Sequence, residues 1–228
     1  MKKNNFKYFI LYTFLLLLIS CKDTGSKMDQ SIENGVEQKQ EEIITIDKDE
    51  NKNREKWQKP ETVVRLMGDL TGKTVADIGA GTGYFTFRIA MKADKVIAID
   101  IEKDYLDVLD NLKEKLPLDI QTKIETRLAK EDDPLLKQQE VDLIVIINTF
   151  SFIDNKLKYL EKLKNDLKPG GKIFIVDFKM KNLPIDAPDK KDRLPVNKLE
   201  NLLEKSGFHN IQTDDTTLDF QYIIIAEK

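Results

Sequence analysis

The chain has 228 residues, and its 37 basic and 40 acidic side chains give a formal net charge of −3. The two signs are interspersed, so the charge balance gives no reason to expect nucleic acid as an obligatory partner. A single cysteine, Cys21, and a single histidine, His209, exclude an internal disulfide and a Cys/His zinc cluster, and leave little room for Ser-His-Asp hydrolysis.

The first 21 residues have the pattern of an export signal. A lysine-containing start precedes an apolar run, Phe9 to Ile19, which is too short for an ordinary transmembrane helix. The run ends in Leu18-Ile19-Ser20-Cys21, which resembles a bacterial lipobox. The resemblance implies removal of residues 1–20, diacylglyceryl attachment at Cys21 and a membrane-anchored lipoprotein on the extracytoplasmic side. A plain signal peptide or an uncleaved anchor remains the alternative.

Residues 21–53 are polar and poor in aromatics, which predicts a flexible tether between the lipidated cysteine and a single domain at 54–228. The domain opens with a helix predicted over Glu61–Leu70, because Pro60 suits a helix start and an apolar stripe follows it. Trp57, the only tryptophan, is predicted either to pack in the core or to form part of a lid over the glycine loop described next.

The segment Thr74 to Ala90 organises the domain. Thr74–Ile78 reads as a buried parallel strand, the turn Gly79-Ala80-Gly81-Thr82-Gly83 follows, and Tyr84–Met91 has helical apolar spacing. A strand, glycine turn and helix in this order place backbone N–H groups at a crevice at the carboxyl end of a sheet. Asp77 at the strand end strengthens the prediction of a ligand site over a purely structural turn.

Strands and helices then alternate along the rest of the chain. The predicted strands are Lys95–Asp100, Thr122–Leu128, Val141–Thr149, Lys172–Phe178, Asn210–Thr213 and Phe220–Glu227. The predicted helices are Glu102–Leu116, ended by Pro117, Leu157–Leu167 and Val196–Ser206. This alternation predicts an α/β fold with a doubly wound, mostly parallel sheet.

Residues 54–228 resemble the class I S-adenosylmethionine-dependent methyltransferases. The likeness rests on VADIGAGTGYFT at Val75–Thr86, the acidic strand end Asp100, EDDP at Glu131–Pro134, VDLIVIIN at Val141–Asn148 and LKPGGKIFIVDF at Leu167–Phe178. It implies a Rossmann-like seven-stranded sheet of order 3-2-1-4-5-7-6 with an antiparallel last strand. It also implies S-adenosylmethionine as cofactor and methyl transfer to an unidentified small-molecule or membrane-associated acceptor.

The resemblance assigns cofactor-binding roles to residues at the strand ends. They are Asp77 for the methionyl ammonium, the N–H groups of Gly79, Ala80, Gly81, Thr82 and Gly83 for the carboxylate, Asp100 for the ribose hydroxyls, Ile101 beside the adenine, Asp132 (or Asp133) near the adenine amino group, and Asn148 beside the sulfonium. For Asp132 the alternative is an acidic turn that starts a helix before Leu135.

The substrate side departs from the family pattern. Related proteins often carry Tyr-His-His-like residues after the fourth strand, where this chain has Phe150-Ser151-Phe152. No catalytic base can therefore be named. His209 is expected in a surface turn, and Asp177 suits either the pocket wall or a structural role. No metal site is expected.

Two alternatives stay open. A nicotinamide-dependent oxidoreductase usually carries G-x-G-x-x-G, a spacing that differs from the one found here. An exported, lipid-anchored, non-catalytic binding or scaffold protein would explain why the leader sends the domain away from a cytosolic cofactor.

Overall fold

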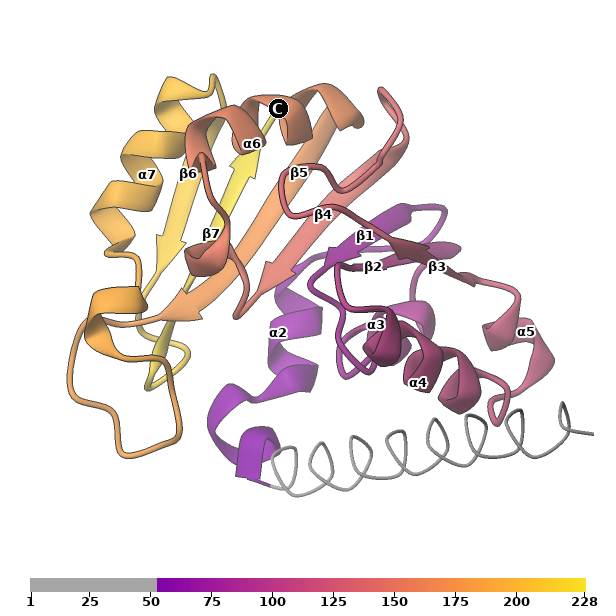
Figure 1. The fold of residues 1–228 in the computed structure, drawn as a ribbon. Coiled ribbons are helices and arrows are strands. Elements are labelled where there is room, and N and C mark those ends of the chain that lie inside the picture. Colours follow the sequence, from indigo (N-terminus) through magenta and orange to yellow (C-terminus); the bar gives the residue numbers. More distant parts are fainter. Residues whose placement is uncertain (1–52) are drawn as a thin grey trace, which may run out of the picture. The chain divides into compact units, whose positions relative to one another are not determined.

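The structure, a computed structural model, describes residues 53–228, so the predicted leader, Cys21 and the tether up to residue 52 lie outside the described residues. The described part is built on one seven-stranded sheet of order β3-β2-β1-β4-β5-β7-β6 (Figure 1). Every neighbouring pair is parallel except those of β7, which runs antiparallel to β5 and β6. The predicted fold and strand order are thus confirmed. The strands are β1 Thr74–Ile78, β2 Lys95–Asp100, β3 Ile124–Leu128, β4 Val141–Ile147, β5 Leu167–Phe178, β6 His209–Asp214 and β7 Gln221–Glu227.

Helices cover both faces of the sheet (Figure 1). One face is covered by α2 (Pro60–Leu66), α3 (Thr86–Ala90), α4 (Lys103–Lys113) and α5 (Leu118–Gln121), and the other by α6 (Lys156–Asp166) and α7 (Val196–Lys205). A further helical segment occupies 53–58, and short 3-10 helices, η1 and η2, occupy Phe150–Phe152 and Lys190–Asp192. Within residues 53–228, no helix has both the length and the apolar character needed to cross a bilayer.

The central strands read as continuous apolar runs because both of their faces are buried. In β1, Val75 belongs to the core under α2 to α4, whereas Ala76 and Ile78 belong to the core under α6 and α7. Ile78 pairs in register with Ile99 of β2 and Ile146 of β4. The residues that follow these three strands are therefore neighbours at one edge of the sheet.

Two elements differ from the sequence prediction near the glycine loop and at Pro117. Helix α3 begins at Thr86 and not at Tyr84, because the turn closed by Gly83, with a φ of 96°, continues through Phe85. The predicted helix Glu102–Leu116 is observed as α4, which already ends at Lys113, four positions before Pro117. Pro117, with a φ of −56°, instead caps the start of α5.

Strand β5 begins five residues earlier than predicted, at Leu167. Leu167 pairs with Val141, and after an irregularity in the register Lys172 pairs with Leu143. The Pro-Gly-Gly segment between these two pairs precedes the predicted strand Lys172–Phe178, but it lies within β5, at the irregularity in the register.

Candidate functional site

A cleft of 810 Å³ opens at the carboxyl ends of β1, β2 and β4, the edge at which open α/β sheets bind ligands. Its wall combines the glycine loop, the end of β2, the turn after β3 and the loop after β4. Among the predicted site residues it brings together Gly79, Gly81, Asp100, Ile101 and Asp132. The others do not line it: Asp77, Ala80, Thr82 and Gly83 are buried, and Asn148 lies on a second cavity described below.

At positions 79 and 83 both the backbone conformation and the neighbouring side chains require glycine. Gly79 has a φ of 78°, and a Cβ there would lie 2.1 Å from the Thr149 Oγ1. At Gly83, with a φ of 96°, a Cβ would lie 2.7 Å from the Phe87 ring. Glycine at these two positions lets the loop after β4 and helix α3 pack directly on the turn.

The N–H groups of the loop are mostly used within the protein. Four of the five in residues 79–83 have protein acceptors: those of Gly79 and Ala80 donate to Ile99 O (2.8 and 3.0 Å), that of Gly81 to Asp100 Oδ2 (2.8 Å) and that of Gly83 to Ala80 O (3.0 Å). The sequence predicted a row of N–H groups open to a ligand. The structure instead fastens the loop to the end of β2 and leaves the Thr82 N–H as the remaining donor of these five.

Asp77 lies under the loop with 3% of its surface exposed. Its Oδ2 accepts a hydrogen bond from the Thr86 Oγ1 at 2.7 Å. Burial raises the pKa of Asp77 to about 6; the Thr86 hydrogen bond opposes this, the Asp100 charge adds to it, and the Arg54 charge lowers it. Because the ionised carboxylate is unfavourable in this environment, a bound cation would stabilise it. The assignment of Asp77 to an ammonium group stays a prediction.

Asp100 is held in one orientation by backbone donors. Its Oδ2 accepts from the Gly81 N–H at 2.8 Å and its Oδ1 from the Glu102 N–H at 3.0 Å. A carboxylate offers about four lone-pair directions, so roughly one on each oxygen remains for a ligand in the cleft. A pair of neighbouring hydroxyl groups matches such an acceptor pair.

The two acidic residues after β3 have different roles. Asp132 is exposed and lines the cleft, as does the apolar side chain of Ile101, which is 50% exposed. Asp133 instead accepts from the Leu135 N–H at 2.7 Å and lies 3.3 Å from the Lys162 Nζ. No helix begins before Leu135, so the helix-start alternative for Asp132 is wrong.

Hydrogen bonds to Asp177 fix the loop after β4. The Oδ2 of this buried residue accepts from the Ser151 N–H at 3.0 Å and the Ser151 Oγ at 2.6 Å, while Oδ1 accepts from the Phe178 N–H at 2.8 Å. Burial raises the pKa of Asp177. Of the two uses considered for Asp177, the structural one is observed. Phe152, 60% exposed, lines the cleft.

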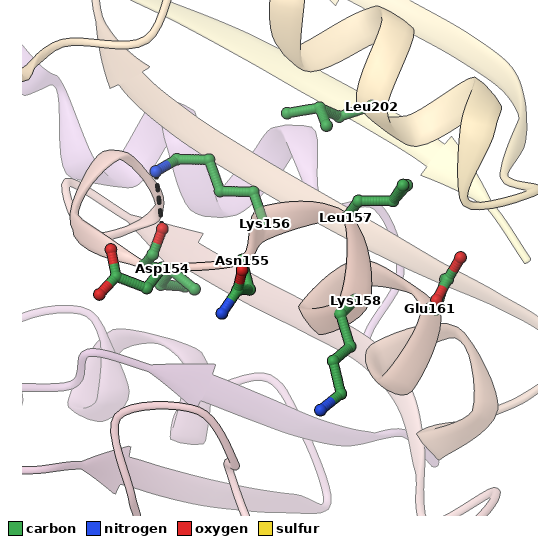
Figure 2. A pocket seen from close by; sticks show the side chains of 8 residues that line it. Asp154, Asn155, Lys156, Leu157, Lys158, Glu161 and Leu202 are labelled. Atoms are coloured by element: carbon green, nitrogen blue, oxygen red, sulfur yellow. Dashed lines mark hydrogen bonds between the residues drawn. The ribbon is translucent and has the colours of Figure 1, made fainter.

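Lys156 ties the same loop to the first turn of α6. Its Nζ donates to Ile153 O at 2.6 Å, the bond drawn in Figure 2, and to Ser151 O at 2.9 Å. Burial lowers the pKa of Lys156. The shallow hollow of 520 Å³ shown in Figure 2 shares Ile153, Asp154 and Asn155 with the cleft wall. These bonds fix the rim of the cleft.

A second cavity, of 610 Å³, lies on the other side of the β4 end. Asn148, in left-handed conformation with a φ of 61°, lines this cavity, whereas the next residue, Thr149, lines the cleft. The remaining wall comes from the start of the domain and from the segment after β5: Asn53, Arg54, Lys56, Trp57, Phe178, Pro184, Ile185 and Asp186. The Trp57 ring is half-buried, with its centroid 5.9 Å from that of Phe178. Trp57 is therefore neither a core residue nor a lid on the glycine loop.

Sequence reasoning missed the contacts that anchor the segment 53–58. The guanidinium groups of Arg54 and Arg88 each lie 4.3 Å from the Tyr84 ring centroid, which joins this segment to the residues after the glycine loop. Gln58 and Gln221 are fully buried and bonded at 2.7 Å although they are 163 positions apart. Neither pattern nor spacing could have identified that pair.

Two other sequence expectations concern acid–base and metal chemistry. His209 is exposed and is the first residue of the edge strand β6, whereas a turn was expected; it lines neither cavity. Within residues 53–228 no group of three or more His, Cys, Asp or Glu side chains is arranged to hold a metal ion.

Comparison with known proteins connects this geometry to a family. A family model described as "Methyltransferase domain" matches residues 69–220. Phosphoethanolamine N-methyltransferase 1 of Triticum aestivum is 32% identical over 128 residues, which are 54% of this chain and 25% of that protein. A tRNA U34 carboxymethyltransferase of Haemophilus influenzae is 28% identical over 73% of this chain and 54% of its own length. This chain thus spans between a quarter and about half of these curated relatives.

Among solved structures, a SAM-dependent methyltransferase from Aquifex aeolicus superposes with a TM-score of 0.73. The match has 24% sequence identity and covers 81% of this chain and 97% of the other. At this identity the likeness establishes the shared fold.

Proposed function

Because this chain belongs to the methyltransferase domain family, we propose that it transfers a methyl group from S-adenosylmethionine to an oxygen-bearing or otherwise nucleophilic small molecule. The observation that carries the proposal is the cleft at the ends of β1, β2 and β4. It holds a glycine loop, an acidic acceptor at the end of β2, an apolar flank and a second acid in the arrangement that a methionyl nucleoside needs.

The residues present fit this cofactor part by part. Asp100, fixed by two N–H groups, would accept from the ribose hydroxyls, and Ile101 and Asp132 would contact the adenine. Asp77, unfavourable as a lone buried anion, would be stabilised by the methionyl ammonium directly or through water.

When bound, the cofactor supplies an activated methyl group on its sulfonium. The protein's part is alignment of nucleophile, methyl and leaving sulfur, and exclusion of water. Thr149 lines the cofactor cleft and Asn148 the second cavity, so we place the acceptor in the second cavity, with the reacting atoms meeting at this end of β4. A general base is required only for an acceptor that must lose a proton.

Calorimetry of the full chain with S-adenosylmethionine and S-adenosylhomocysteine tests the proposal. Saturable one-to-one binding is expected, with thermal stabilisation of a few kcal/mol, roughly 3 at a hundredfold excess over the dissociation constant. A chain that binds neither compound would refute methyl transfer. It would fit the non-catalytic binding protein considered from the sequence.

We further propose that Cys21 carries a lipid that holds the domain at a membrane, which would allow a membrane-associated acceptor. The proposal rests on the lipobox-like end of the leader, and it predicts that Cys21→Ser moves the chain from the membrane to the soluble fraction of cells. Unchanged fractionation of the variant would refute lipid anchoring.

A further inference from the structure

Four side chains beside the second cavity form a continuous chain of hydrogen bonds. The Arg54 Nε donates to the Gln58 Oε1 at 2.5 Å, and the Gln58 Nε2 donates to the Gln221 Oε1 at 2.7 Å. The Gln221 Nε2 donates in turn to the Asn148 Oδ1, which also accepts from the Gln58 Nε2 at 3.1 Å. We call these residues, Arg54, Gln58, Gln221 and Asn148, the amide relay.

The direction of the relay is set at its start. A guanidinium group has donors only, so the oxygen of Gln58 must face Arg54 and its NH₂ group must face Gln221. Gln221 must then accept through its oxygen and donate through its nitrogen. Gln58 and Gln221 are fully buried, so a reversed amide would leave a buried donor or acceptor without its partner.

The last member of the relay presents donors to the cavity. Asn148 uses its Oδ1 as the acceptor for both glutamines, and its Nδ2 has no acceptor among residues 53–228. Asn148 is partly exposed and lines the second cavity. Its two N–H groups are therefore available to an occupant of that cavity.

The rest of the wall limits the occupant. Trp57, Phe178, Pro184 and Ile185 offer apolar and aromatic surface, which favours a flat apolar body. Arg54 and Lys56 on one side and Asp186 on the other give the wall charged groups of both signs.

We propose that Asn148 Nδ2 donates to an oxygen of the methyl acceptor, and that the acceptor has a flat apolar body. Arg54, Gln58 and Gln221 act as positioning residues that fix this polarity. The inference rests on the proposed function, since it defines the acceptor class for the same site.

Three small aromatic probes test this polarity with the full chain saturated with S-adenosylhomocysteine. Acetophenone carries a hydrogen-bond-accepting oxygen, ethylbenzene has nearly the same shape without it, and aniline is a neutral hydrogen-bond donor. Dissociation constants from ligand-observed NMR titrations are expected to be at least tenfold lower for acetophenone than for ethylbenzene. Equal affinities, or no binding of acetophenone, would overturn the proposal.

Two variants change the polarity and leave the shape of the site unchanged. Asn148→Asp keeps the oxygen that both glutamines need and tolerates the left-handed backbone, but replaces the NH₂ by an oxygen. It should weaken acetophenone binding at least tenfold. In Gln58→Glu the carboxylate still accepts from Arg54 but cannot donate to Gln221. The side-chain amides of Gln221 and Asn148 must then both exchange their donor and acceptor ends. This variant should make aniline the preferred probe, a change of preference that loss of structure would not produce.

A matched control is Asn210→Asp, the same replacement at another left-handed asparagine, on the edge strand β6 that lines neither cavity. It should leave all three probe affinities unchanged. Retention of the acetophenone preference in Asn148→Asp would refute the inference, and this variant suffices if Gln58→Glu does not fold. Calorimetry with S-adenosylhomocysteine distinguishes failure of the proposed function from failure of the amide relay. If the wild-type chain does not bind S-adenosylhomocysteine, the proposed function is refuted. If it binds this compound but shows no preference among the probes, only the amide relay is refuted.

Discussion

Asp77→Asn isolates the energetic effect of a charge buried under the glycine loop. The substitution keeps the size of the side chain and an oxygen that can accept from Thr86, but removes the ionisation. The difference between a pKa of about 6 in the folded protein and 3.8 as the ordinary value corresponds to about 3 kcal/mol of stability.

The sign of the effect depends on pH. Well below pH 3.8, the ordinary pKa, the Asp77 carboxyl is neutral in both the folded and the unfolded chain, so ionisation leaves the free energy of unfolding unchanged. As the pH rises from well below 3.8 to well above 6, the unfolded chain ionises first. The free energy of unfolding of the wild type then falls by about 3 kcal/mol, a loss that the variant does not suffer. Any constant cost of burying the new amide is the same at both pH values and cancels.

Urea unfolding of both proteins at pH 4 and pH 7.5, without cofactor, measures how the ionisation of Asp77 changes the free energy of unfolding. The free energy of unfolding of Asp77→Asn, relative to wild type, should rise by roughly 2.4 kcal/mol between the two pH values, because the unfolded chain is already partly ionised at pH 4. Asp119→Asn, at an exposed position on α5, is the control and should show no such rise. A relative stability of Asp77→Asn that stays constant with pH would refute the reasoning. If the carboxylate also binds the methionyl ammonium, the variant should bind S-adenosylmethionine more weakly although it is more stable at pH 7.5.

Three further predictions concern the cleft and its support. Asp100→Ala should remove most S-adenosylhomocysteine binding in calorimetry, because the acceptor pair for the ribose is lost; unchanged affinity would refute that assignment. Gly79→Ala should lower the melting temperature, since its Cβ would lie 2.1 Å from the Thr149 Oγ1 at a φ of 78°; a melting temperature equal to wild type would contradict the close approach. Glu140, whose two oxygens accept from Arg127 at 2.9 Å, has its pKa lowered to about 2 mainly by that pairing. Its contribution to stability should be present above pH 4.5 and lost as the pH falls towards 2, a slope that Glu140→Gln should lack in acid titrations followed by circular dichroism.

The backbone frame was predictable because strong local patterns agreed with one another. The apolar runs of β1, β2 and β4, each ending in a polar or glycine residue, predicted where the parallel strands stop and hence which residues meet. Asp100 and Ile101 lie on the cleft for that reason. The antiparallel β7 and the strand order came from the family resemblance and were confirmed.

Side-chain partners were less predictable, because they depend on residues far apart in the chain. The spacing of EDDP could not decide between Asp132 and Asp133. In the structure the Leu135 N–H and the Lys162 side chain engage Asp133, and Asp132 is the one that lines the cleft. Asn148 was expected beside the sulfonium at the end of β4, which stays a prediction; the structure adds that its left-handed backbone lines the second cavity. The loop N–H groups were expected to be open, but the carbonyl of Ile99 and the carboxylate of Asp100 engage three of them.

The position of Trp57 has a practical consequence for measurement. It is the only tryptophan of the chain and lies on the wall of the second cavity, against Phe178. Emission excited at the red edge of the indole band therefore comes from this one location, without a background from other indoles. The natural protein carries its own optical probe, so entry and departure of compounds in that cavity can be timed in a stopped-flow instrument without a label.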